Sequence, residues 1–269
     1  MDKQVVNYKD LGIIDYKTAW DYQENLLQEN VKLKAATGKS VLAHEPVDHK
    51  DPVLPLWANG ENADLAIAGN QLPQVSEPAT KHYLLLCEHP PVYTLGKSGH
   101  MDNILISEEA LQRQGIQFFK TNRGGDITFH GPQQIVGYPI IDLEKFYTDI
   151  GRYLRELEEV IILTLAEYDI LGERSKGETG VWIQPGVVGK ERKICAMGVR
   201  CSRWVTMHGF ALNVNTDLNY FNNIVPCGIK NKRVTSLEQE LQANVDLSEV
   251  KEKIKRNFRH VFNVVLAGT

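Results

Sequence analysis

Apolar residues recur at helical spacing in three parts of the chain. Between residues 15 and 34 the spacing predicts an amphipathic helix, for which Asp15 is a suitable N-terminal cap. The recurring positions are Tyr16, Ala19, Trp20, Gln23, Leu27 and Val31. Residues 149–169 predict a second helix, which ends just before Gly172. A last helix is predicted after Ser248, a possible cap, with an apolar face of Val250, Ile254, Phe258 and Val261.

Short apolar runs bounded by glycine or proline predict strands between these helices. The runs are 83–87, 116–120, 126–130, 135–141, 180–184, 192–201 and 205–214. Because the strands come in groups and do not alternate regularly with helices, the pattern favours an α+β fold over a doubly wound parallel sheet.

Residues 35–80 follow neither the helical nor the strand pattern. Five of the chain's 11 prolines lie there, at positions 46, 52, 55, 73 and 78. This segment is therefore predicted to be an irregular insert, with a short helix near residues 63–68, in an otherwise single catalytic domain spanning residues 1–269.

Composition narrows the class of protein and its compartment. The chain has 269 residues and a net charge of −4, so nothing suggests a nucleic-acid partner or a disordered chain. No apolar run is long enough to predict a membrane span or a signal sequence. The four cysteines, at 87, 195, 201 and 227, show no metal-binding spacing, so we expect free thiols in the cytoplasm and no metal.

Three segments carry more glycine, histidine or cationic residues than packing requires. In residues 123–132, Gly124 and Gly125 allow a positive φ and a close approach to a ligand, although a simple hairpin turn explains them equally well. In residues 193–200, strand alternation places Lys193, Cys195, Met197 and Val199 on one face, and the pattern alone favours a solvated edge charge for the lysine.

The third segment is a predicted turn around Cys227. Pro226 precedes this cysteine and Gly228 follows it, which places its thiol in a turn and makes it more exposed than a thiol in a strand. Exposure and a nearby cation are what a nucleophilic cysteine needs. The other three cysteines lie in strand-like runs, where a buried and inert thiol is the expected state.

Together these segments resemble the lipoyl(octanoyl) transferase family. The blocks 88–96 (EHPPVYTLG), 123–132, 193–200 and 208–214 resemble that family's motifs in their order, and residues 226–229 supply its cysteine turn. One position departs from the family pattern. The family usually reads Gly-Pro-Gly-Gln after the histidine, and here Gln133 replaces the second glycine of that motif. The resemblance implies a mixed sheet flanked by helices, the fold of the biotin and lipoate protein ligases.

The resemblance also implies a two-step acyl transfer without a cofactor. Cys227 would take an octanoyl group from octanoyl-acyl carrier protein as a thioester, and Lys193 would lower the pKa of its thiol. The acceptors would be lysines on lipoyl domains of 2-oxoacid dehydrogenase complexes and on the glycine cleavage H protein. The implied acyl and pantetheine cleft consists of Arg123, Gly124, Gly125, Asp126, Ile127, Thr128, Phe129, His130, Ala196, Met197, Gly198, Gly209, Phe210 and Ala211.

Two other functions remain open at this point. An ATP-dependent lipoate-protein ligase shares the implied fold but needs no nucleophilic cysteine, so the cysteine turn argues against it. A non-catalytic binding protein for lipoyl domains would have no use for Cys227 and Lys193 together. A biotin ligase is disfavoured because its G-R-G-R-x-G loop is absent.

Overall fold

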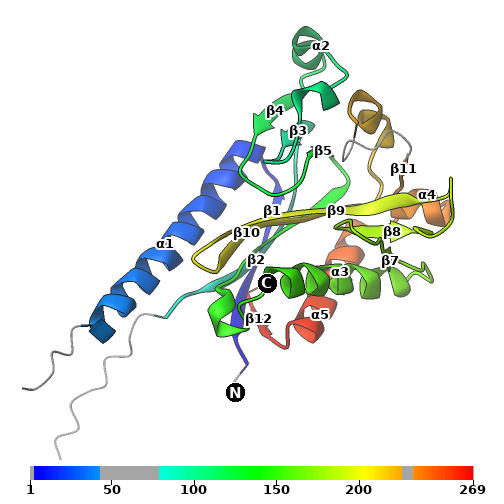
Figure 1. Ribbon diagram of the computed structural model, residues 1–269. Coiled ribbons are helices and arrows are strands. Elements are labelled where there is room, and N and C mark those ends of the chain that lie inside the picture. The colour runs from blue at the N-terminus through cyan, green and yellow to red at the C-terminus, as the bar shows by residue number, and fades with distance from the viewer. Residues whose placement is uncertain (1–2, 43–78, 226–232, 269) are drawn as a thin grey trace, which may run out of the picture.

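The computed structural model describes residues 3–42, 79–225 and 233–268 (Figure 1). Its main feature is a nine-stranded sheet in the order β12-β1-β2-β6-β10-β9-β8-β7, with β11 pairing with β9 outside this path. The strands are β1 (Val5–Ile13), β2 (His82–Glu88), β6 (Gln134–Ile140), β7 (Glu173–Arg174), β8 (Val181–Ile183), β9 (Arg192–Ser202), β10 (Val205–Asn213), β11 (Arg233–Val234) and β12 (Val265–Ala267). Parallel and antiparallel pairs both occur, so the predicted α+β fold with a mixed sheet is confirmed.

Helices cover both faces of this sheet, as Figure 1 shows. The helix α1 (Tyr16–Leu42) packs on one face over a buried cluster that includes Leu27, Val136 and Ala211. The helices α3 (Ile150–Ala166) and α5 (Leu247–Val261) pack on the other face over a larger cluster that includes Phe210 and Leu212. Alternation along β10 therefore decides which side chains face α1.

A second, three-stranded sheet lies beside the first. Its order is β4 (Gln117–Lys120), β3 (Val92–Leu95) and β5 (Ile127–His130), and its core includes Tyr93 and Phe129. Two short helices, α2 (Glu108–Arg113) and α4 (Leu237–Leu241), complete the chain together with 3₁₀ turns at Met101–Asn103, Leu143–Lys145 and Leu218–Asn223.

The predicted helices and the longer strands are confirmed, with three corrections. The first helix continues to Leu42 and not to residue 34, because Ala35 and Ala36 favour its continuation and no proline interrupts the chain before Pro46. Asp246, not Ser248, caps the last helix, because its side chain accepts the Ser248 N–H at 2.8 Å. The short helix predicted near residues 63–68 lies outside the described residues.

The third correction concerns strict alternation along β9. The register between β8 and β9 shifts, because Val181 pairs with Cys195 but Trp182 pairs with Lys193. Ile194 and Cys195, although adjacent in sequence, both belong to the core under α3 and α5. This β-bulge means that Lys193 and Cys195 do not share a face, contrary to the prediction.

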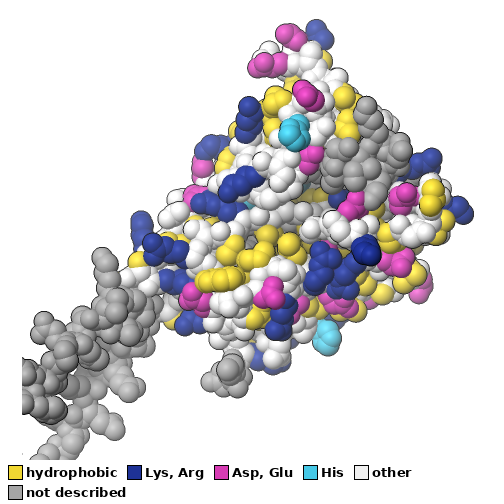
Figure 2. Space-filling model, in the orientation of Figure 1, with side chains coloured by type: hydrophobic (Ala, Val, Ile, Leu, Met, Phe, Trp, Pro, Cys, Tyr) yellow, Lys and Arg dark blue, Asp and Glu magenta, His cyan; other side chains and the backbone are white. Residues whose placement is uncertain are grey.

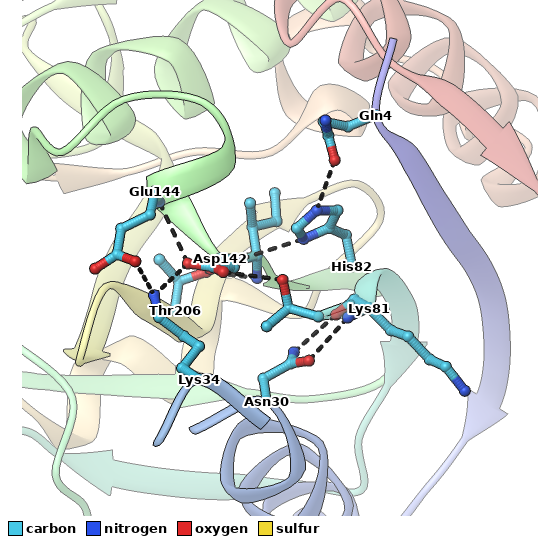
Figure 3. Close-up of polar contacts among 10 residues, drawn as sticks. Gln4, Asn30, Lys34, Lys81, His82, Asp142, Glu144 and Thr206 are labelled. Atoms are coloured by element: carbon cyan, nitrogen blue, oxygen red, sulfur yellow. Dashed lines mark hydrogen bonds and ion pairs between the residues drawn. The ribbon is translucent and has the colours of Figure 1, made fainter. Parts of the chain in front are cut away.

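A polar network joins the two chain segments that flank residues 43–78 (Figure 3). The Lys34 ammonium on α1 lies 2.5 Å from one carboxylate oxygen of Asp142, and the Thr80 hydroxyl donates to the other oxygen at 2.9 Å. The Asn30 side chain accepts from the backbone N–H of Lys81 at 2.8 Å and donates to its carbonyl at 2.7 Å. The end of α1 and the start of β2 are therefore held together by residues outside that segment.

Acidic and basic side chains are interspersed on the face shown in Figure 2. This distribution agrees with the small net charge of −4. Within the three described ranges, no helix combines the length and the apolarity that crossing a membrane requires.

Candidate active site

A cavity of about 690 Å³ lies between the two sheets. Its walls come from β5 and the preceding loop on one side, and from β6, β9 and β10 on the other. It brings together predicted residues from three separate blocks: Arg123, Gly124, Gly125, Asp126, Ile127, Thr128, His130, Lys193, Ala196, Met197, Gly198, Gly209, Phe210 and Ala211.

One predicted site residue that the structure describes, Phe129, does not line this cavity. Phe129 points to the opposite side of β5, where its ring stacks on Tyr220 with a centroid distance of 4.5 Å. This follows from strand alternation, because Thr128 and His130 face the cavity. Cys227 lies outside the described residues.

Close backbone packing explains the glycines around the cavity. The Gly124 N–H donates to the Val199 carbonyl at 2.9 Å and ties the loop to β9. A Cβ on Gly198 would lie 2.6 Å from the Gly124 carbonyl oxygen, so only glycine fits there. Gly125 has φ +85°, which disfavours any other residue. The glycine pair therefore forms a turn and allows a close approach at the same time.

The Arg123 side chain secures this loop against β3. Its guanidinium donates to the Thr94 carbonyl at 2.6 Å, to the Thr94 hydroxyl at 2.9 Å and to the Gly124 carbonyl at 3.0 Å. Arg123 is only 7% exposed, so these contacts hold a buried cation at the edge of the cavity.

Lys193 is half-buried at the end of the cavity that β9 forms. Its ammonium lies 4.6 Å from the centroid of the Trp182 ring, a cation–π contact. Its backbone carbonyl accepts the Thr235 N–H at 3.0 Å, directly after β11 pairs with β9. Lys193 is thus hydrogen-bonded to the chain that follows residues 226–232.

The other end of that segment is also anchored near the cavity. The Val225 N–H donates to the Asn103 carbonyl at 2.8 Å, and the Leu105 N–H donates to the Asn223 carbonyl at 2.9 Å. Phe221 and Val234, one on each side of the segment, both line the cavity. The described residues before and after residues 226–232 therefore both reach the cavity that contains Lys193.

The three described cysteines are poor candidates for a nucleophile. Cys87 and Cys195 are fully buried and Cys201 is half-buried. Burial raises the pKa of all three thiols above the usual value. Because the thiolate is the reactive form, these residues stay inert near neutral pH, as predicted for strand cysteines.

The hydrogen bonds of His130 assign its neutral tautomer. The Gln134 amide nitrogen donates to the Asn213 side chain at 2.8 Å and to the Phe129 carbonyl at 3.2 Å, so its oxygen accepts from His130 Nδ1 at 2.9 Å. The ring proton is therefore on Nδ1, and Nε2 carries the lone pair. Burial lowers the pKa of His130 well below its usual value, which keeps the ring neutral.

Several cavity residues were not predicted from the sequence. Val136, Tyr138 and Gln134 alternate along β6, and this period-2 pattern was available as a signal. Tyr16 reaches the cavity from the first turn of α1, and no local sequence feature distinguishes it from an ordinary core residue. Beyond these, the lining also includes His208 and Asn213, which lie in the 208–214 block.

Comparisons with known proteins decide the family. The sequence model of the lipoyl protein ligase A/B catalytic domain matches residues 63–259. An octanoyltransferase of Christiangramia forsetii is 52% identical over 267 residues, which cover 99% of each chain, and one of Flavobacterium psychrophilum is 51% identical over 97% of each. The chain belongs to the octanoyltransferase family. It is therefore an acyltransferase.

Solved structures show that octanoyltransferases of this kind share their fold with lipoate ligases. Lipoate-protein ligase A bound with ATP superimposes with a TM-score of 0.60 at 12% identity, over all of this chain and 89% of that one. A bipartite lipoate protein ligase from Thermoplasma acidophilum gives a TM-score of 0.57 at 17% identity, over 70% of this chain and 74% of that one. The expected ligase-like fold is thus confirmed.

Proposed function

We propose that this octanoyltransferase moves an octanoyl group from octanoyl-acyl carrier protein to a lysine of a lipoyl domain, through a thioester on Cys227. The observation that carries the proposal is the position of Lys193 at the cavity, hydrogen-bonded to the chain that resumes after the Cys227 segment. The acceptors would be the lipoyl domains of 2-oxoacid dehydrogenase complexes and the glycine cleavage H protein.

In the first step the Cys227 thiolate attacks the thioester carbonyl, a new C–S bond forms, and the C–S bond to the carrier breaks. The carrier leaves as a thiol after its sulfur takes up the proton that Cys227 lost. The Lys193 ammonium favours the thiolate by charge. The Trp182 ring limits where that ammonium can go, since it lies within 4.6 Å. In the second step the acceptor amine attacks the acyl-enzyme, a C–N bond forms, the C–S bond breaks, and the amine's proton returns to the sulfur.

The other described groups support this assignment of roles. The three buried or half-buried cysteines have raised pKa values, which leaves Cys227 as the thiol best placed to ionise. Residues 123–128, His130 and residues 196–198 and 209–211 would bind the acyl chain and the pantetheine arm along the cavity walls. The free thiols at Cys87, Cys195 and Cys201 fit a reducing compartment such as the cytoplasm.

Intact-mass spectrometry after incubation with octanoyl-acyl carrier protein tests the proposal. We expect one octanoyl adduct, mapped by peptide analysis to Cys227 and lost in Cys227→Ser. Cys201→Ser is the matched control and should acylate normally. Lys193→Ala should slow acylation roughly tenfold or more and move alkylation of Cys227 by iodoacetamide to higher pH.

Three results would contradict the proposal. An adduct on another cysteine would remove Cys227 from its role, and an unchanged alkylation profile in Lys193→Ala would remove Lys193. Transfer of octanoate to a lipoyl domain that needs ATP, with no transfer from the thioester, would favour a ligase.

A further inference from the structure

The register of three strands sets the floor of the cavity. Ala196 on β9 pairs with Ala211 on β10, and Ala211 pairs with Val136 on β6. All three side chains line the cavity and form one row across the strands. The next residue of the row is Cys87 on β2, which pairs with Val136 but is fully buried. The row of small residues therefore leads from β9 to β6.

The two ends of this row differ in chemistry. Lys193 and Val234 lie at the β9 end, where the reacting groups are proposed to meet. The β6 end is formed by Val136 and two aromatic residues, Tyr138 and Tyr16, which are all 3% exposed or less. Among the described residues, none of β2 lines the cavity, and its residues behind Val136 belong to the core under α1. The cavity therefore closes at β6.

The length of the row matches a specific acyl chain. Neighbouring strands are about 4.8 Å apart, so the row from Ala196 on β9 across β10 to Val136 on β6 covers about 10 Å. Lys193 lies three residues before Ala196 on β9, so the row begins beside Lys193 and not at it. Seven carbon–carbon bonds of about 1.5 Å in a zigzag span about 9 Å, the length of an extended eight-carbon chain. A longer chain would meet Val136, and a shorter one would leave apolar surface unfilled.

We propose that the saturated acyl chain lies across β9, β10 and β6 with its carbonyl at the Lys193 end, and that Val136 stops its methyl end and sets the preferred chain length. The inference rests on the proposed function for the identity of the reacting end. The cavity also extends the other way, over β9 toward Leu154 on α3, which gives the alternative direction for the chain.

Competition between acyl donors tests the position of the stop. Hexanoyl-, octanoyl- and decanoyl-acyl carrier protein are offered together, and the initial rates of the three adducts are read by intact mass. Because one methylene in a fitted apolar pocket changes discrimination about tenfold or more, Val136→Ala should raise the decanoyl-to-octanoyl ratio by about that factor. Val136→Leu should lower the octanoyl-to-hexanoyl ratio by a similar factor.

Two controls separate chain length from stability and direction. Val160→Ala removes the same two methyl groups from a fully buried valine of α3 away from the cavity, and should leave every ratio unchanged. Leu154→Ala enlarges the opposite end of the cavity and should not favour decanoyl donors.

The outcomes distinguish the inference from the function on which it rests. An unchanged decanoyl-to-octanoyl ratio in Val136→Ala would overturn the assignment of Val136 while leaving acyl transfer intact. A shift toward decanoyl donors in Leu154→Ala and not in Val136→Ala would do the same. Absence of any adduct in the parent protein, with all three donors, would overturn the proposed function itself.

Discussion

Gln133 occupies a backbone conformation that usually belongs to glycine. Its φ is +63°, in the turn between β5 and β6, at the position where the octanoyltransferase pattern has Gly-Pro-Gly-Gln. The turn is held by its neighbours, since the Gln133 N–H donates to the Glu88 carboxylate at 2.8 Å and its carbonyl accepts the Asn215 N–H at 3.1 Å. These contacts offset a left-handed conformation that costs a non-glycine residue about 1 kcal/mol.

Replacing Gln133 by glycine and by alanine tests this strain. Both variants remove the side-chain contact to Asn215, so their difference isolates the backbone. Gln133→Gly should be the more stable of the two by about 1 kcal/mol in urea unfolding. At the exposed helical position Glu252 the order should reverse, with alanine more stable than glycine by a similar amount. Alanine more stable at both sites would mean that Gln133 is not strained.

His208 shows the same kind of strain inside a strand. It has φ +57° and faces Pro139 of β6, which has no N–H to offer the ladder. The His208 N–H donates to the Gln23 side chain of α1 at 2.9 Å. A residue of α1 thus supports the backbone of a cavity residue, which the sequence pattern of neither segment indicates.

Among the elements, α5 offers the sharpest test of a local assignment. Asp246 accepts the Ser248 N–H at the start of this helix, although Ser248 is also a cap-forming residue type. Asp246→Ala should lower the free energy of unfolding by about 1 kcal/mol, whereas Ser248→Ala should change it by a few tenths at most. Chemical denaturation of both variants checks this, and an equal loss in the two would restore Ser248 as the cap.

The bulge in β9 interrupts the alternation of side chains that the sequence of this strand predicts. Alternation alone places Lys193 beside Cys195, yet the extra residue opposite β8 separates them. Lys193 lines the cavity, and Cys195 is enclosed in the core, where burial raises its pKa. The separation keeps an inert thiol away from the proposed reaction.

Four buried histidines in the described part of the chain have lowered pKa values. Burial lowers the pKa of His82 and of His89 to about 4 and that of His208 to about 3, and it lowers that of His130 well below its usual value. The unfolded chain binds protons near pH 6.5, so it takes up more protons than the folded chain at pH values between about 4 and 6.5.

The free energy of unfolding should therefore be nearly independent of these groups above pH 7 and fall steeply below pH 6.5. Denaturant titrations from pH 7.5 to pH 5 check whether the free energy of unfolding falls and how many protons the chain takes up on unfolding. His82→Asn should reduce the slope of the free energy of unfolding against pH by the equivalent of about one proton, because it removes one of these histidines. The variant is suitable because His82 lies outside the cavity and its Nδ1 accepts the Asp142 N–H, a role that an asparagine oxygen can take over. Constant stability down to pH 5 would contradict this account.

The sequence alone determined the long, periodic elements and the residues with unusual chemistry. The helices α1, α3 and α5 follow from the helical spacing of one buried face, and the strands β2, β6, β9 and β10 follow from apolar runs bounded by glycine or proline. The glycine pair at 124 and 125 also identified a segment with a positive φ at Gly125, whereas its predicted close approach to a ligand stays a prediction.

Only the tertiary structure decided how these parts meet. The strand β1, the edge strand β12 and the short strand β3 were missed, because their pairing partners are distant in the chain and their own patterns are weak. The bulge beside Lys193 and the row from Ala196 to Val136 both depend on register between strands. Register is fixed by hydrogen bonds and packing across the sheet, and no single segment of sequence contains that information.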